Sequence, residues 1–247
     1  MLCATLSFEI VSKVKAKALF FSTRVWFLLA YLSMSADVIQ RLVVFFGPFL
    51  FALCFHEYAH GLVAKWRGDN TAERLGRLTL NPFAHADIIG TFVFPIMSIV
   101  LNSPISFGWA KPVPVDSRNL KNVRTDMFWI ALAGPMSNIL LAVLSAVVLF
   151  FVVKLNLFVG FQSGLFEFIK TFMTLNLFLA FFNILPIHPL DGGKVLARFL
   201  PASINYKLEQ HEGIMSLILM VLLFSGAIHF LSYPVLLVYN FLIRLAI

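Results

Sequence analysis

The stretch His56-Glu57-Tyr58-Ala59-His60 sets two imidazoles and one carboxylate in the spacing H-E-x-x-H. On a helix, residues four apart lie on one face, separated by about 6 Å of rise, so both imidazoles can bind the same Zn²⁺ ion. The glutamate between them can then activate a water molecule for hydrolysis. The alternative interpretation is that these are polar side chains reaching toward water from the end of a helix.

The sequence around the motif favours the metal. The motif lies in "LFALCFHEYAHGLVA", residues 50–64, which is otherwise apolar. Burying Glu57 and both histidines there without a shared partner would cost on the order of several kcal/mol, and a metal ion supplies that partner.

A catalytic zinc usually has three protein ligands and one open position, so a third ligand must come from elsewhere. Asp191, in "NILPIHPLDGGKVL", is the best candidate because it directly follows an apolar run. Asp-Gly-Gly is also ordinary turn chemistry, and the local sequence alone favours the turn. Glu73 and Asp87 compete from an Arg-rich polar loop that offers salt-bridge partners. His188 competes because it lies one helical turn before Asp191.

The composition indicates an all-α polytopic membrane protein. Of the 247 residues, 60% are hydrophobic and 13% are charged, whereas soluble domains carry about a quarter charged residues. The net charge of +7 comes from basic residues placed between apolar runs. We interpret them as topology determinants that face anionic lipid, so membrane lipid is an expected partner and nucleic acid is not.

Crossing a bilayer takes about 20 helical residues. The sequence predicts a bundle of about five to six transmembrane helices, with long runs at 42–64, 127–153 and 165–187 and shorter ones at 214–231 and 235–247. The run 88–101 is shorter than a span, contains Pro95 and precedes a Pro/Gly-rich stretch. It predicts a re-entrant or β-hairpin segment after the metal-binding helix.

Three regions are expected along the chain. Residues 1–36 form an N-terminal segment in which 18–32 is an extra membrane helix, an interfacial segment or a signal-like leader. Residues 37–212 form the catalytic membrane core, and 213–247 form a C-terminal helical hairpin.

A shared metal imposes a test on this topology. His60 lies near the end of its run, and Asp191 just past the end of 165–187, so these two helices must run in the same direction. That holds if 88–101 does not cross the membrane. The region 65–126 on the metal side is rich in Lys and Arg, whereas the opposite loop, 154–164, offers Lys154 alone. By the positive-inside rule, the metal side faces the cytoplasm.

The motifs "GRLTLNP", "FGWAKPVPV", "AGPMSN" and "NILPIHPLDGG" follow H-E-x-x-H in that order. In this order they resemble the site-2 protease family of intramembrane zinc metalloproteases, over residues 42–212. The similarity is greatest to the short bacterial and archaeal members, which lack PDZ and CBS domains. It implies that His56, His60 and Asp191 bind one Zn²⁺ ion and that Glu57 is the general base.

The resemblance also implies roles for two asparagines. Asn183, in the family pattern N-x-x-P-x-x-P-L-D-G, would orient substrate or stabilise the oxyanion, although a helix–helix hydrogen bond explains it equally well. Asn138, in "AGPMSN", would shape the cleft around the metal, whereas close helix packing is the simpler explanation of this motif. His188 stands where the family usually has an apolar residue or proline, which leaves its role open.

The expected function is a zinc-dependent intramembrane endopeptidase, acting on transmembrane segments of substrate proteins at a prokaryotic inner membrane. A membrane metal transporter, or a non-proteolytic homologue that binds membrane partners, is the alternative. Polar groups clustered at one depth favour a reaction site over a transport path. No oligomeric state follows from the sequence.

Overall fold

The computed structural model describes residues 38–101, 108–157 and 162–247. The chain divides into two compact units, Met1–Leu42 and Val43–Ile247. The expected N-terminal segment 1–36, with its candidate helix 18–32, lies outside the described residues. All the motifs discussed above belong to the second unit.

Helices form nearly all the regular structure of the second unit. They are α2 (Gly47–Trp66), α3 (Thr71–Arg74), α4 (Phe94–Val100), α5 (Val123–Lys154), α6 (Gln162–Asn183), α7 (Asp191–Ala197), α8 (Ala202–Gln210), α9 (Glu212–Phe224) and α10 (Ser232–Ala246). Short helical turns are η1 (Leu42–Phe46), η2 (Pro82–His85), η3 (Ile88–Val93), η4 (Ser117–Asn119) and η5 (Ala227–Leu231). In the described ranges there is no β-strand, so the helical class is confirmed there.

Four described helices are long and apolar enough to cross a membrane: Val38–Trp66, Val123–Lys154, Ser163–Asn183 and His229–Ala246. The predicted count of five to six is not reached among the described residues. The run 214–231 does not form one span, because α9 ends at Phe224 and the chain then turns at Gly226, whose φ is +76°. A helix of 13 residues rises about 20 Å, less than the hydrocarbon core.

The segment 88–101 is helical rather than a β-hairpin. It forms η3 and α4, which together make one short apolar helix, Ile88–Val100. The β pairing found among the described residues is an isolated antiparallel bridge between Ala86 and Ala110. The predicted hairpin is therefore not confirmed, although the segment is too short to count as a span.

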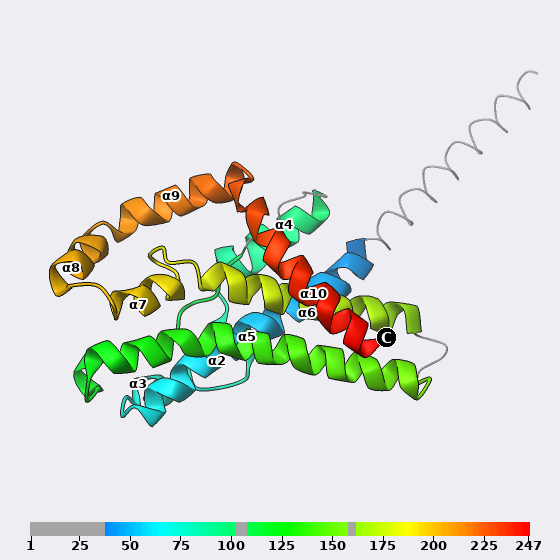
Figure 1. The fold of residues 1–247 in the computed structure, drawn as a ribbon, viewed down its shortest axis with the longest axis horizontal. Coiled ribbons are helices and arrows are strands. Elements are labelled where there is room, and N and C mark those ends of the chain that lie inside the picture. The colour runs from blue at the N-terminus through cyan, green and yellow to red at the C-terminus, as the bar shows by residue number, and fades with distance from the viewer. Residues whose placement is uncertain (1–37, 102–107, 158–161) are drawn as a thin grey trace, which may run out of the picture. The chain divides into compact units, whose positions relative to one another are not determined.

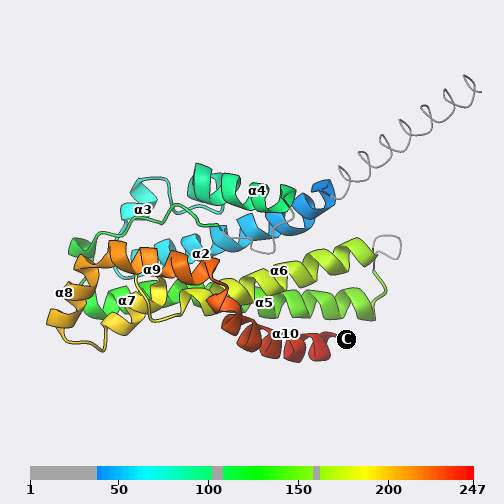
Figure 2. The ribbon, with the colours of Figure 1, turned by 90° about the horizontal axis from the view of Figure 1, so that it is seen from above.

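Helix α5 is the centre of the second unit and contacts α2, α6, α7 and α10. In both ribbon views, α2 and α6 run in the same direction and α5 runs opposite to them (Figures 1 and 2). This meets the topological requirement derived from the sequence, because the C-terminal ends of α2 and α6 come to the same end of the bundle.

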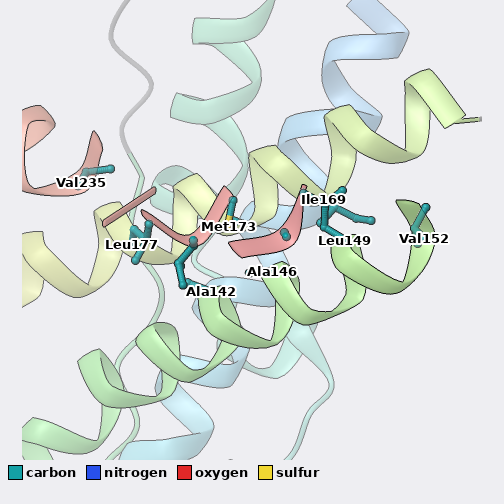
Figure 3. Close-up of a cluster of buried hydrophobic side chains, with 10 residues drawn as sticks. Ala142, Ala146, Leu149, Val152, Ile169, Met173, Leu177 and Val235 are labelled. Carbon is teal, nitrogen blue, oxygen red and sulfur yellow. The ribbon is translucent and has the colours of Figure 1, made fainter. Parts of the chain in front are cut away.

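Helices α5, α6 and α10 pack together through a cluster of buried hydrophobic side chains (Figure 3). Ala142 and Ala146 lie four residues apart on α5, where small side chains allow α6 to approach. Leu149 and Met173 fill the space beside them and are fully buried. The outward face of α5 is apolar but exposed, as at Leu144, which suits contact with lipid.

Leu149→Ala should destabilise the protein by about 2–4 kcal/mol, because a cavity would replace its packing contacts with α6 and α10. The matched control is Leu144→Ala on the same helix, where the side chain is 47% exposed and little packing is lost. Thermal unfolding in detergent measures both. Equal effects of the two substitutions would contradict the helix arrangement described here.

Candidate metal centre

The two histidines of H-E-x-x-H lie on the face of α2 that packs against α5 and α6. His56 is 5% exposed and His60 is 8% exposed. Their rings meet edge to face, with centroids 4.6 Å apart. Asp191, 7% exposed, reaches the same point from the first residue of α7. The structure thus brings together three sequence candidates from distant parts of the chain.

The three candidate ligand atoms lie close enough for one metal ion. His56 Nε2 is 3.0 Å from Asp191 Oδ2, His60 Nε2 is 3.0 Å from His56 Nε2, and His60 Nε2 is 3.2 Å from Asp191 Oδ2. Tetrahedral coordination with bonds of about 2.0 Å places ligand atoms about 3.3 Å apart. The observed spacings fit three corners of such a site.

The hydrogen bonds on the far side of each ring fix where the histidine protons are. His60 Nδ1 is 2.7 Å from the Ile130 carbonyl oxygen, which can only accept, so Nδ1 carries the proton. His56 Nδ1 is 2.7 Å from Asn138 Oδ1, also an acceptor. Both Nε2 atoms are then free to direct lone pairs at each other and at a carboxylate. Such a convergence is repulsive unless a proton or a metal cation lies between the three atoms.

Two glycines make this approach possible. A Cβ at Gly134 on α5 would lie 2.4 Å from His60 Nε2 and 2.6 Å from His56 Nε2, so no side chain fits there. A Cβ at Gly192 would lie 2.2 Å from the Ile184 carbonyl oxygen. The Asp-Gly-Gly sequence therefore lets the first turn of α7 lie directly on the end of α6. Asp191 begins a helix instead of sitting in a turn.

Glu57 faces a segment that follows α4 in the chain. The Val113 N–H donates to Glu57 Oε2 at 2.8 Å. Both neighbours of Val113 are prolines, Pro112 and Pro114, which have no N–H to donate. Among the described residues no donor reaches the other carboxylate oxygen, Oε1, which is left for water or substrate.

Asp69 anchors the same segment at its far end. Its carboxylate is fully buried and accepts from the Asp116 N–H at 2.7 Å, from Asn119 Nδ2 at 2.8 Å and from the Thr71 N–H at 3.0 Å. Burial alone would raise the pKa of Asp69, but the hydrogen bonds from Thr71, Asn119 and Asp116 outweigh it and lower that pKa. The segment that holds Glu57 is thus tied to the end of α2.

A cavity of about 750 Å³ opens beside these groups. Most of its wall is apolar, and its polar lining includes Glu57, Asp191 and Asn183. The amide of Asn183 donates to the Leu179 carbonyl of its own helix at 3.0 Å. Asn138 does not line the cavity; it is fully buried and bonded to His56.

The competing ligand candidates have other partners or lie outside the group. Glu73 pairs with Lys65 at 2.6 Å. Asp87 accepts from the N–H groups of Ile89 and Gly90 and so caps η3. His188 is buried and is not among the three residues whose atoms converge.

Comparison with known proteins finds a family and two relatives for this chain. The sequence model of Peptidase family M50 matches residues 159–226. "Putative zinc metalloprotease YwhC" of Bacillus subtilis is 35% identical over 183 residues, which cover 73% of this chain and 80% of that protein. The chain belongs to peptidase family M50, the site-2 protease family. A second relative, "Putative zinc metalloprotease Rip2" of Mycolicibacterium smegmatis, is 31% identical over 117 residues, covering 44% of this chain and 43% of that protein.

No solved structure matches the chain significantly. Membership of M50, a family of zinc metalloproteases, implies that the metal of this chain is zinc. The group His56, His60 and Asp191 offers the nitrogen and oxygen donors that zinc binds. M50 membership and the four apolar helices also make the chain a multi-pass membrane protein.

Sequence reasoning missed several groups around this M50 site. The Ile130 carbonyl and the Val113 N–H are backbone groups, so the residue types at these positions do not indicate that they bind His60 and Glu57. Gly134 was explained by helix packing, but it lies against both imidazoles. Asn176 gave a signal, since it is a polar residue inside an apolar run, but nothing in the sequence connects it with Asn138.

Gly134→Ala should greatly weaken zinc binding, because the added methyl group would overlap the two ligand nitrogens. Gly164→Ala on α6 is the control, since nothing lies within 4 Å of a Cβ there. Zinc content of the purified variants measures the effect. Full zinc occupancy in Gly134→Ala would show that the metal does not lie where these three atoms converge.

Proposed function

We propose that this protein is a zinc-dependent intramembrane endopeptidase that cleaves membrane-spanning substrate proteins. The observation that carries the proposal is the convergence of His56 Nε2, His60 Nε2 and Asp191 Oδ2 within 3.2 Å beside a cavity that Glu57 lines. In this proposal the two histidines and Asp191 bind one Zn²⁺ per chain, and Glu57 is the general base.

Zinc, when bound, would supply a Lewis acid and lower the pKa of water to about 7. Glu57 would take the proton of the attacking water on its carboxylate and deliver it to the leaving amine. The Val113 N–H holds Oε2 of Glu57, so Oε1 is the oxygen with access to that proton. The Nδ1–H groups of His56 and His60 donate to Asn138 Oδ1 and to the Ile130 carbonyl, so the two histidines take no part in proton transfer.

Asn183 is proposed to orient the substrate or stabilise the oxyanion. It lies at the end of α6 on the cavity wall, and its Nδ2 bonds only its own helix at 3.0 Å. That bond to Leu179 can be exchanged for one to a substrate carbonyl at little cost. Asn138, by contrast, is bonded to His56 and has no exposed surface from which to meet a substrate.

A helical substrate must unwind locally to present its carbonyl groups, and an extended peptide could then pair with the β-prone pieces within residues 72–114. Several backbone groups in that region already have partners: the Val113 N–H binds Glu57, the Lys111 N–H binds the His85 carbonyl, and the Lys111 carbonyl accepts from Arg77 at 2.8 Å. Pairing at Val113 would therefore have to displace Glu57, which favours other positions for the substrate strand.

The lipid, substrate and orientation proposals rest on the apolar spans and on charge. Exposed apolar side chains cover the outward face of α5, so lipid surrounds the spans and transmembrane segments are the accessible substrates. The basic residues of 65–126 lie at the metal end, which supports a site facing the cytoplasm of a prokaryotic cell.

The proposed core, 37–212, contains every residue of the site. The proposed C-terminal region, 213–247, adds part of the cavity wall through Ser216, Leu219, Met220 and Leu223 of α9. In this proposal α9 completes the cavity wall, whereas α10 packs against α5 and α6 and does not fold back along α9, so the expected hairpin is not formed (Figures 1 and 2).

Glu57→Gln should lower peptide-bond cleavage by about 10²- to 10⁴-fold while zinc content stays at the wild-type level, because the amide cannot accept a proton. Reconstituted vesicles with a panel of single-span substrates measure cleavage, and elemental analysis measures zinc. Cleavage that persists in Glu57→Gln would refute the assigned base.

Asp191→Ala should lose zinc, since two histidines alone leave the ion without its third protein ligand. Asp87→Ala removes a carboxylate that caps η3 outside the metal group and should keep one zinc per chain. Elemental analysis of both variants is the measurement. If Asp191→Ala retained zinc and activity, another residue would have to be the third ligand.

A further inference from the structure

We propose that Asn176 on α6 is a positioning residue for the metal site, acting through Asn138 on α5 to keep His56 Nε2 directed at the metal. This inference rests on the proposed role of His56 as a ligand. Both asparagines are fully buried in the bundle, at 0% exposure, although an apolar pair would suffice for packing. Neither residue lines the cavity.

The amide of Asn176 has one orientation. Its Nδ2 donates to the Phe172 carbonyl at 2.8 Å, and a carbonyl can only accept. The Oδ1 atom is therefore the one that faces Asn138. Exchanging the two ends of this amide would place two oxygens against each other at the Phe172 end.

The amide of Asn138 is oriented in turn. Its Nδ2 donates to Asn176 Oδ1 at 2.8 Å and to the Ala52 carbonyl at 3.2 Å, and both of these atoms are acceptors. Oδ1 of Asn138 must then face His56 Nδ1, 2.7 Å away, and it can only accept. The proton of His56 is thereby held on Nδ1, and Nε2 keeps its lone pair toward Asp191 Oδ2.

The relay crosses three helices and is screened from water. In a buried site an amide that turned around would lose its bonds without gaining bonds to solvent, so each orientation is retained. Without Asn176, the Nδ2 group of Asn138 would keep only its longer bond, the one to the Ala52 carbonyl. His60 needs no such relay, because its Nδ1 meets the backbone carbonyl of Ile130. His56 is therefore the ligand whose orientation depends on side chains.

The test compares single and double variants. Their zinc affinity is measured by competition with a chelator on purified protein in detergent. Asn138→Leu should weaken zinc binding about 10- to 100-fold, as is usual when a partner of a metal-bound histidine is removed. Asn176→Leu should weaken it about fivefold. Ser145→Ala removes a buried hydroxyl that bonds only its own helix and should leave zinc affinity unchanged.

Asn138→Asp separates positioning from general packing. Either oxygen of the new carboxylate can accept the His56 proton, so no amide orientation has to be set, and the other oxygen then lies against the acceptors Asn176 Oδ1 and the Ala52 carbonyl. Asn138→Asp should bind zinc more tightly than Asn138→Leu, because it still offers an acceptor to the His56 Nδ1 proton. Asn176→Leu should then cost nothing further in this background, whereas it costs about fivefold in the wild-type background. The absorption spectrum of the Co²⁺ form should change on Asn176→Leu in the wild-type background and should stay the same on Asn176→Leu in the Asn138→Asp background.

An equal loss of zinc affinity on Asn176→Leu in both backgrounds would overturn the relay and leave Asn176 a packing residue. Unchanged zinc affinity in Asn138→Leu would also overturn it. Failure of the proposed function looks different: wild-type protein would hold no stoichiometric zinc, or His56→Ala would bind zinc as tightly as wild type. Thermal unfolding of each variant without metal identifies any that are misfolded, and the Asn138→Asp pair still decides the question if Asn138→Leu does not fold.

Discussion

The rest of the structure depends on the convergence of three electron-rich atoms inside a helical bundle. His56 Nε2, His60 Nε2 and Asp191 Oδ2 lie 3.0–3.2 Å apart, and 135 positions of sequence separate His56 from Asp191. Lone pairs at that spacing repel in a low-dielectric interior, so the arrangement makes physical sense with a cation between them. A divalent metal satisfies all three groups at once. The surrounding helices therefore have to hold the ligands at a fixed spacing against this repulsion.

Helix α5 makes most of the contacts that hold the three ligands in place. Its small residues Ala142 and Ala146 let α6 approach, which brings the end of α6, and with it α7, level with the motif in α2. In lipid there is no hydrophobic driving force between helices, so close packing and buried hydrogen bonds must hold the bundle together. The same helix lies against the imidazoles at Gly134 and supplies their hydrogen-bond partners, the Ile130 carbonyl and Asn138. One helix, α5, therefore both packs the bundle together and orients the metal ligands.

Much of this could be predicted from the sequence because it follows from apolar length and residue type. The long runs 127–153 and 165–187 match α5 and α6 within a few residues, and the short run 88–101 is a short helix. The break at Gly226 was missed because the run 214–231 is apolar on average, and hydropathy gives no sign that the backbone at Gly226 is left-handed. The hydrogen-bond partners of the histidines could not be predicted from the sequence either. The partner of His60 is a backbone carbonyl, which every residue type has. The contact between Asn138 and Asn176 joins two helices, and its position depends on how the folded bundle packs.

The metal ligands and Glu57 are held by different parts of the protein. Hydrogen bonds from α5 orient His56 and His60, whereas the Val113 N–H, in a segment tied down by Asp69, orients Glu57. A shift of that segment would release the Glu57 carboxylate without disturbing any bond to the imidazoles. Metal binding and proton transfer are therefore separable in this fold. Val113 and Asp191 line the same cavity, so a substrate bound there can contact the segment that supports the proposed base as well as the metal ligands, and a shift of that segment would move Glu57 while the metal stays in place.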